Sequence, residues 1–363
     1  MSVSVDERVD RYTVSVDEFS RFQRDGFVVV RGLVSQAEVD ELREHTEALM
    51  QGELPEQRTV APRADAGNAG PSRVLEPPPA HLSSDEKAQW FLRIHMLHRQ
   101  LELHERYLLH PRVLDVLEAL IGPDVSAVQS MLFLKPPGKP GQGWHQDSFY
   151  IPTHPDTLCG AWIAIDEADE LNGAMWFAKG SQVEPIYPPP VDTYGFSDQT
   201  MLSGLECVRG VSEPDDDRNA LSAVANRYDQ VLAGARPGDV VFFDGHVLHR
   251  SKANFTTDRY RRAFVGHYMN ARSFTQWGKI VEPDEESMAA DVIDELTGGT
   301  NGSHILARGD THLPFGLPRF GTPCSALEPP EQRRRRSEYA QRILARADSM
   351  LGCAAATPAM DDD

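Results

Sequence analysis

Residues 238–251 read Gly-Asp-Val-Val-Phe-Phe-Asp-Gly-His-Val-Leu-His-Arg-Ser. The apolar run at the start of this stretch is rich in β-branched and aromatic residues, which is typical of a buried strand. Gly245 then marks a turn, and His246 and His249 follow it. A strand that leads into a turn with histidines can present an imidazole as a metal ligand.

Similar runs occur on both sides of this stretch. Each is short, is either apolar or alternates between apolar and polar residues, and is separated from the next by Gly, Pro or Asn. The runs cover residues 125–134, 158–165, 174–178, 239–244 and 262–269. Because several short strands with such turns are typical of an antiparallel sandwich or barrel, we expect a mainly β core with flanking helices, an α+β fold.

The part of the chain ahead of these runs shows helical periodicity and helix-start signals. Ser35 and Glu38 form a capping box, and Pro111 occupies a favourable first helical position. Residues 51–79 lack periodicity and predict a long loop. The expected elements are helices over residues 16–24, 35–50, 84–109 and 111–121, and a strand over residues 27–30.

Composition excludes several classes of protein. Asp and Glu outnumber Lys and Arg by 55 to 36, giving a formal net charge of −19, so we expect no nucleic-acid partner. The four cysteines are far apart without a CxxC pair, which favours a reducing compartment. We see no signal peptide and no apolar run long enough to span a membrane, so the prediction is a cytoplasmic protein without a membrane partner.

Residues 143–147, Gly-Trp-His-Gln-Asp, contain a second candidate ligand group. Residues two apart on a strand point to the same face, so His145 and Asp147 could bind one ion. With a histidine from residues 246–249 they would occupy one face of an octahedral Fe(II), which leaves three positions for a bidentate 2-oxoacid and O2. An arginine cluster at residues 259–262 could clamp a distal carboxylate of that 2-oxoacid.

These motifs together resemble the phytanoyl-CoA dioxygenase (PhyH) family of Fe(II)- and 2-oxoglutarate-dependent oxygenases. The resemblance extends over residues 15–272, and its segments follow the order found in the family. The matching segments are residues 26–32, His110-Pro111, residues 120–123, residues 144–147, residues 173–177 with Gly180-Ser181, Gly238-Asp239, and His249 with Ser251 and Asn254.

The resemblance implies a double-stranded β-helix, the cupin-like jelly-roll barrel, with His145, Asp147 and His249 as iron ligands. It favours His249 over His246 because Ser251 and Asn254 follow His249 at the family's offsets. We expect a dioxygenase domain over residues 1–275, with a helical first part, a barrel from about residue 125 and a polar insertion over residues 187–232. We expect a helical extension with a disordered tail over residues 276–363, which could pack on the barrel or form a homo-oligomer.

For 2-oxoglutarate, the resemblance implies Arg261, with Ser251 supporting the same carboxylate. Trp162 and Met131 match residues that line the cosubstrate pocket in relatives, although strand residues of these types are more often core. Arg93, placed on the predicted helix before the barrel, matches a basic residue that contacts the cosubstrate in relatives.

Two departures from the family pattern affect this assignment. The spacing from His249 to Arg261 is one residue longer than usual, and Arg250 replaces a common glycine. Arg259 therefore remains an alternative carboxylate clamp. Lys135 and Lys139, in the loop at the expected substrate entrance, could meet an anionic substrate, but we expect them to be solvated.

The predicted activity is oxidation of an unactivated C–H bond of a small molecule, with 2-oxoglutarate and O2 converted to succinate and CO2. Hydroxylation, desaturation, ring closure and epimerisation are not distinguished by any residue. The acidic chain favours a substrate without CoA, such as a natural-product or catabolic intermediate. The alternatives are a cupin-type metal enzyme that does not use 2-oxoglutarate and a non-catalytic jelly-roll binding protein.

Overall fold

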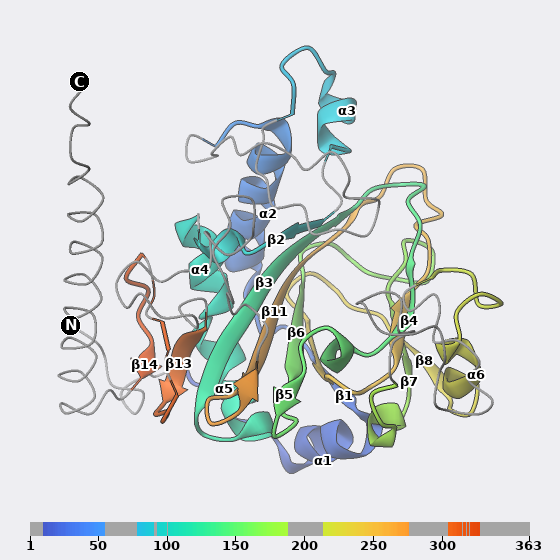
Figure 1. The fold of residues 1–363 in the computed structure, drawn as a ribbon. Coiled ribbons are helices and arrows are strands. Elements are labelled where there is room, and N and C mark those ends of the chain that lie inside the picture. Colours follow the sequence, from blue (N-terminus) through green and yellow to red (C-terminus); the bar gives the residue numbers. More distant parts are fainter. Residues whose placement is uncertain are drawn as a thin grey trace, which may run out of the picture.

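Two mainly antiparallel sheets face each other in the computed structural model (Figure 1). It describes residues 10–54, 78–90, 93–99, 101–187, 213–275 and 304–326, except residues 314, 317 and 319. The large sheet has the order β1-β9-β6-β11-β3-β13-β14, with β2 paired to β3, and the small sheet has the order β4-β10-β7-β8. The strands β5 and β12 form a separate pair.

The strands of the large sheet are β1 Phe27–Val30, β2 Arg93–His95, β3 Val125–Lys135, β6 Cys159–Ala164, β9 Val240–Asp244, β11 Arg261–Asn270, β13 Ile305–Gly309 and β14 Ser325–Ala326. Those of the small sheet are β4 Gln142–His145, β7 Met175–Ala178, β8 Gln230–Ala233 and β10 His249–Ser251, and the separate pair is β5 Thr153–His154 and β12 Phe274–Thr275. The helices are α1 Val16–Asp25, α2 Gln36–Gln51, α3 Ser84–Ala88, α4 Glu102–Leu108, α5 Pro111–Ile121 and α6 Leu221–Ala225, with the 3-10 turns η2 Leu97–Arg99, η3 Asp147–Phe149 and η4 Ser181–Val183.

The strand β9 shows why its sequence is apolar without interruption. Val240 and Phe242 belong to the cluster that packs against the helices, whereas Val241 and Phe243 belong to the cluster between the two sheets. All four side chains are buried, so both faces of the strand are covered and no polar position is tolerated. The expectation of a mainly β core with flanking helices is confirmed.

Helices cover the face of the large sheet that lies away from the small sheet (Figure 1). Both α1 and α2 begin with the Ser-x-x-Glu capping box, in which the serine hydroxyl accepts from the backbone of the glutamate and the glutamate accepts from the backbone of the serine. Gly26 ends α1 in the left-handed conformation, with φ of 81°, and the chain enters β1 directly. The elements expected over residues 16–24, 27–30, 35–50 and 111–121 are therefore confirmed.

The single helix expected over residues 84–109 is wrong. This segment contains the short helix α3, the strand β2, the turn η2 and the helix α4. Strand β2 is antiparallel to β3, with Ile94 opposite Leu132 and its side chain buried. Pairing with β3 satisfies backbone groups that a local helix would otherwise have satisfied, so the neighbouring strand overrides helix propensity here.

Strands also occur where the sequence indicated none. The described part of the expected extension contains β13 and β14, and β13 joins the edge of β3. The described part of the expected insertion contains α6 and β8, and β8 pairs with β7. Most of the helical extension expected over residues 276–363 lies outside the described residues, as do residues 55–77 of the expected loop.

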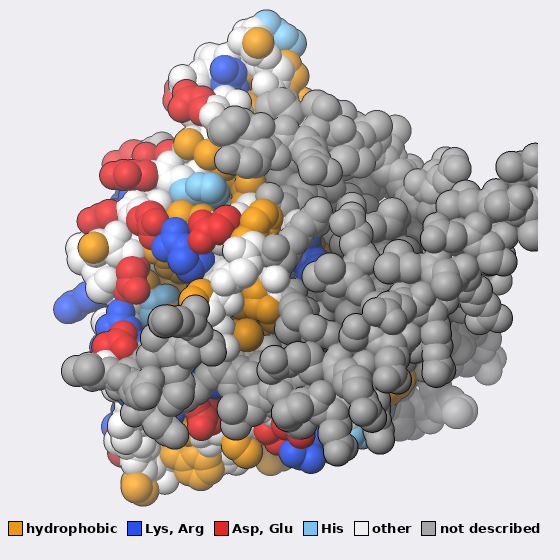
Figure 2. All heavy atoms as spheres, turned by 90° about the vertical axis from the view of Figure 1, so that its left-hand side faces the viewer, with side chains coloured by type: hydrophobic (Ala, Val, Ile, Leu, Met, Phe, Trp, Pro, Cys, Tyr) orange, Lys and Arg blue, Asp and Glu red, His pale blue; other side chains and the backbone are white. Residues whose placement is uncertain are grey.

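Charged side chains are mixed on the described part of the face shown in Figure 2, where Asp and Glu stand out with Arg and Lys between them. Several charges pair between helices: Arg106 Nη2 lies 2.8 Å from Glu41 Oε1, and Arg112 Nη2 lies 2.8 Å from Glu38 Oε2. Among the described helices, none combines the length and the apolar character that crossing a membrane requires.

Candidate metal centre

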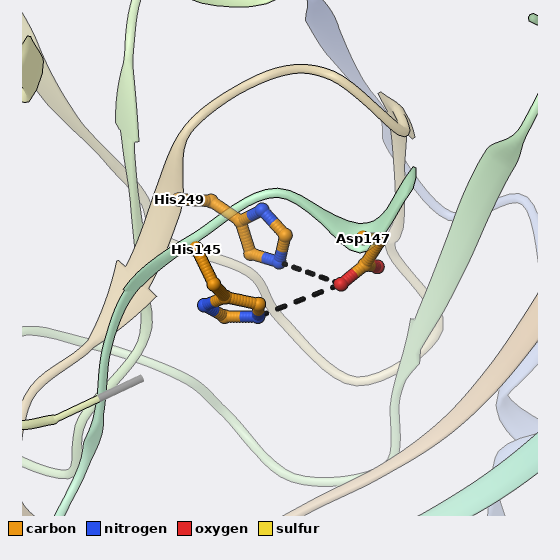
Figure 3. A group of neighbouring side chains, drawn as sticks. All are labelled: His145, Asp147 and His249. Carbon is orange, nitrogen blue, oxygen red and sulfur yellow. Dashed lines mark ion pairs between the residues drawn. The ribbon is translucent and has the colours of Figure 1, made fainter. Parts of the chain in front are cut away.

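Two histidines and an aspartate come together at one end of the small sheet (Figure 3). His145 is the last residue of β4, and His249 is the first residue of β10, directly opposite His145 in the antiparallel register. Asp147 begins the turn η3 immediately after β4. Because β4 ends and turns at this point, the carboxylate two residues after His145 returns to the same side of the sheet.

One carboxylate oxygen of Asp147 lies between the two imidazoles (Figure 3). Asp147 Oδ1 lies 3.5 Å from His145 Nε2 and 3.7 Å from His249 Nε2. One ligand atom from each of the three residues lies within 4.8 Å of the others. Within the described residues, this is the one group of three His, Cys, Asp or Glu side chains with such spacing.

Backbone carbonyls fix the orientation of both imidazoles. His145 Nδ1 lies 2.8 Å from the carbonyl oxygen of Gly143, and His249 Nδ1 lies 3.1 Å from that of Val247. A carbonyl can only accept, so each Nδ1 carries a proton, and in the neutral ring the lone pair is on Nε2. The Nε2 atoms are the ones that face Asp147 Oδ1, as metal ligation requires.

Asp147 is held by a third histidine. His267, on β11 of the large sheet, donates from Nε2 to Asp147 Oδ2 at 2.8 Å, which leaves Oδ1 directed toward His145 and His249. Sequence reasoning missed His267, because β11 and β4 are brought together only by the packing of the two sheets.

Burial and neighbouring charges set the protonation of the site. Burial, with the nearby His249, lowers the pKa of His145 to about 3. Burial opposes ionisation of Asp147, but His249 and the hydrogen bond from His267 outweigh it, so the pKa of Asp147 falls below its usual range. Near neutral pH the site therefore offers a neutral imidazole at His145 and an ionised carboxylate at Asp147.

The two candidate arginines have different surroundings. Arg261, the first residue of β11, is buried, and its guanidinium carbon lies 5.6 Å from the ring centroid of Trp162 and 5.9 Å from that of Phe133. Arg259 is more exposed and makes a two-point ion pair with Asp169, at 2.7 and 3.2 Å. Arg261 thus lies inside the barrel, whereas the Arg259 guanidinium is already paired with Asp169 at the rim of the barrel.

One of the predicted pocket residues, Trp162, lies beside this arginine. Trp162 on β6 and Met131 on β3 are both opposite Val265 of β11, and both belong to the buried cluster between the sheets. Trp162 is at once a core residue and the aromatic surface beside Arg261. Ser251, the last residue of β10, lies two positions beyond His249 on the same strand.

Arg93 does not lie on a helix, as expected, but on β2, opposite Phe133 of β3. Its side chain is half-buried, and burial lowers its pKa. The positive charge of Arg93 is close enough to lower the pKa of His145 further. Arg93 is therefore brought near the metal centre by strand pairing.

The unexpected Arg250 has a structural explanation. Its guanidinium carbon lies 4.6 Å from the ring centroid of Trp144, and its Nη1 contacts both carboxylate oxygens of Asp216 at 2.6 and 2.7 Å. Because neighbouring residues on a strand face opposite sides, Arg250 points away from His249 and Ser251. Through Asp216, Arg250 holds the segment before α6 against the outer face of the small sheet.

Lys135 corrects another expectation. It was expected to be solvated, but it is buried at the end of β3, and its ammonium nitrogen lies 3.0 Å from Ser251 Oγ. Its position directly opposite Arg261 in the β3–β11 register brings two cations together inside the barrel.

Comparison with known proteins places this geometry in context. The family model described as Phytanoyl-CoA dioxygenase (PhyH) matches residues 22–263. The peroxisomal phytanoyl-CoA dioxygenase of Rattus norvegicus is 26% identical over 296 residues, covering 79% of this chain and 77% of the relative. The phytanoyl-CoA dioxygenase domain-containing protein 1 of Danio rerio is 26% identical over 295 residues, covering 72% of this chain and 91% of the relative.

Two solved structures share the fold. The alpha-ketoglutarate-dependent carbocyclase SnoK from nogalamycin biosynthesis superposes with a TM-score of 0.51 at 17% identity, covering 81% of this chain and 94% of its own. The epimerase SnoN, in complex with Fe3+, alpha-ketoglutarate and nogalamycin RO, has a TM-score of 0.50 at 19% identity and covers 85% of this chain and 96% of its own. The expected jelly-roll core is confirmed.

Proposed function

Because this chain belongs to the phytanoyl-CoA dioxygenase family, we propose that it oxidises a C–H bond of a small molecule with Fe(II) held by His145, Asp147 and His249. The family identifies the enzyme class, a 2-oxoglutarate-dependent non-haem iron dioxygenase that converts 2-oxoglutarate and O2 to succinate and CO2. The observation that supports the ligand assignment best is the pair of Nε2 atoms directed at one carboxylate oxygen.

The donor set fits Fe(II). Two imidazoles and one carboxylate suit this ion, and three ligands on one face leave coordination positions for a 2-oxoacid and O2. Bound Fe(II) would supply the activation of O2 that protein side chains cannot perform. The contributions of the chain are to orient the rings through Gly143 and Val247 and to hold Asp147 through His267.

Arg261 is our proposed clamp for the distal carboxylate of 2-oxoglutarate. Among the described residues, no carboxylate pairs with Arg261, and burial lowers its pKa to about 10. A buried guanidinium without a counter-ion is costly, and a bound carboxylate would remove that cost. We assign Ser251 to the same carboxylate, Trp162 and Met131 to the pocket wall, and Arg93 to the cosubstrate near the metal.

The substrate we propose is a small molecule without CoA, such as a natural-product or catabolic intermediate. The net charge of −19 disfavours a polyanionic acyl-CoA, and the structure of SnoN is a complex with nogalamycin RO. A cytoplasmic location is proposed from cysteine usage, since Cys159 and Cys324 are both free thiols.

The test is anaerobic addition of Fe(II) and 2-oxoglutarate to the purified protein. We expect the weak visible charge-transfer band of a chelated 2-oxoacid, and in air slow succinate formation. His145→Ala should abolish the band. Arg261→Ala should weaken 2-oxoglutarate binding by about 10- to 100-fold, because it removes a charge-assisted bidentate contact.

Arg259→Ala is the matched control, because it removes an equal charge two residues away from a guanidinium already paired with Asp169. It should leave the affinity for 2-oxoglutarate unchanged. If iron binds but neither a band nor succinate appears, the proposed 2-oxoglutarate-dependent function and the Arg261 clamp are both wrong.

A further inference from the structure

Lys135 is enclosed by polar groups that carry no charge. Its ammonium nitrogen lies 3.0 Å from Ser251 Oγ, 2.7 Å from the carbonyl oxygen of Lys252 and 3.4 Å from that of Gly173. Gly173 leaves room for this ammonium, because a Cβ at that position would lie 2.9 Å from it. An ammonium has three protons, so these three acceptors use its full capacity.

The buried basic side chains of Lys135 and Arg261 thus belong to directly paired residues, and neither has a counter-ion among the described residues. Lys135 and Arg261 are direct neighbours in the β3–β11 register, and among the described residues neither forms an ion pair. The negative charge of Asp166 acts on Arg261, but the Asp166 carboxylate is already bound by two nitrogens of Arg262. Such an arrangement is costly in the free protein and favours a bound anion.

The hydroxyl of Ser251 contacts both Lys135 of β3 and the backbone of β4. Its oxygen accepts from the Lys135 ammonium and from the backbone N–H of Gln142, at 3.0 and 3.3 Å. A hydroxyl oxygen has two lone pairs, so both are engaged and the single proton of Ser251 must point elsewhere. Among the described residues, no group accepts that proton.

We propose that Lys135 is a positioning residue for the cosubstrate: by donating to the Ser251 hydroxyl, it directs the proton of that hydroxyl toward the distal carboxylate held by Arg261. The inference rests on the proposed function, because it requires 2-oxoglutarate at Arg261. A hydroxyl that accepts from a cation is also a stronger donor, since hydrogen bonds in a chain polarise one another. Lys135 therefore acts on the carboxylate through Ser251 and not by contact.

The experiment measures the dissociation constant of 2-oxoglutarate by calorimetry, anaerobically, on the Fe(II)-loaded full chain. Lys135→Met keeps the length of the side chain and removes its charge, and it should weaken binding by about 10-fold or more. Lys252→Met is the matched control, because the Lys252 ammonium lies 3.6 Å from Glu170 and 4.6 Å from the Trp176 ring centroid, away from Ser251. This variant should bind 2-oxoglutarate as the wild type does.

A double-mutant cycle separates positioning from contact. Ser251→Ala should weaken binding, and adding Lys135→Met to it should change the dissociation constant by less than about twofold, because the bond through which Lys135 acts is already absent. If Lys135→Met weakens binding equally in both backgrounds, Lys135 does not act through Ser251 and the proposal is overturned.

A second ligand shows whether the effect is specific for the distal carboxylate. 2-Oxopentanoate has the same chain length and 2-oxoacid group, but a methyl group replaces that carboxylate. Its affinity should be the same in wild type and Lys135→Met, whereas an equal loss for both ligands would mean general damage to the barrel and would contradict the proposal. Lys135→Arg, which keeps the charge, should recover part of the 2-oxoglutarate affinity.

The failure of this inference is distinguishable from failure of the proposed function. If wild type does not bind 2-oxoglutarate although iron binds, the proposed function is wrong and the positioning role with it. If wild type binds and Arg261→Ala does not, but Lys135→Met matches wild type, the proposed function stands and the role of Lys135 is wrong.

Discussion

His267 shows at the residue scale how a side chain without contact to the metal can govern its binding. The hydrogen bond from its Nε2 to Asp147 Oδ2 fixes which carboxylate oxygen faces the two other ligands. Groups that orient a metal ligand commonly contribute a factor of about 10 to 100 in affinity. We therefore predict that His267→Ala weakens Fe(II) binding by about that factor, measured by anaerobic metal titration.

His267→Gln should recover part of this affinity, because a side-chain amide can still donate to Asp147. His246→Ala is the control, since His246 lies near Asp156 and the Glu184 carbonyl and not among the three ligands. A loss of Fe(II) affinity in His246→Ala equal to that in His267→Ala would count against the ligand assignment.

Single residues also mark where sequence reasoning reached its limit. Local spacing pointed to His145 and Asp147, the family resemblance selected His249 over His246, and the structure brings the three together. The burial of Lys135 was not predicted, because it depends on Ser251 and on the carbonyls of residues 173 and 252. Nothing in the sequence around Lys135 specifies contacts that come from such distant segments.

At the scale of elements, the position of β4 depends on close packing against the segment before α6. Gly143 has no side chain, and the Glu213 carbonyl occupies the space a Cβ would take: a Cβ there would lie 1.7 Å from that oxygen and 2.7 Å from Asn219 Nδ2. Asn219 Nδ2 itself donates to the carbonyl oxygens of Trp144 and Glu213. The segment before α6 thus packs directly on the strand that ends at His145.

We predict that Gly143→Ala lowers the free energy of unfolding by about 1–3 kcal/mol, because either Glu213 or β4 must move. It should also weaken Fe(II) binding, since the Gly143 carbonyl orients His145. Chemical denaturation and metal titration measure the two effects. Gly234→Ala is the control, because a Cβ there would meet the Ala168 carbonyl at an ordinary 3.5 Å. Equal stability of the two variants would contradict this packing argument.

Which elements the sequence could predict follows from how local their signals are. The strand β9 is an unbroken apolar run between a Gly and a turn, and α2 has a capping box, so both were predicted within a residue or two. The strands β2 and β13 were not predicted. Each pairs with the edge of β3 that lies opposite β11, and an edge partner of that kind leaves only a weak local pattern.

Across the whole molecule, neutral histidines are buried on the helical side of the large sheet. Burial, with nearby positive charges, lowers the pKa of His98 and of His104 well below the ordinary value of 6.5. His98 Nδ1 hydrogen bonds to Ser130 Oγ at 2.7 Å, whereas both ring nitrogens of His104 lack a partner within the described part of the chain. His45 and Phe264 pack against the ring of His104.

These histidines should make the fold sensitive to mild acid. The unfolded chain takes up a proton at each of them as the pH falls through about 6.5, but the folded protein does not, so stability is lost below that pH. Each histidine contributes a slope of about 1.4 kcal/mol per pH unit until its folded pKa is reached. Paired carboxylates such as Glu38, whose pKa is lowered, lose their contribution only below about pH 4.5, so the two effects occupy different windows.

His104→Leu tests this prediction, because the variant cannot take up the proton and loses no hydrogen bond to a described residue. Its free energy of unfolding at pH 7 should be close to that of wild type or slightly higher, since a buried polar group without a partner is removed. Between about pH 6.5 and 4.5 its stability should fall less steeply than that of wild type, by about 1.4 kcal/mol per pH unit. His312→Leu, at an exposed position, should keep the wild-type slope, and parallel curves for wild type and His104→Leu would show that the His104 ring is protonated in the folded protein.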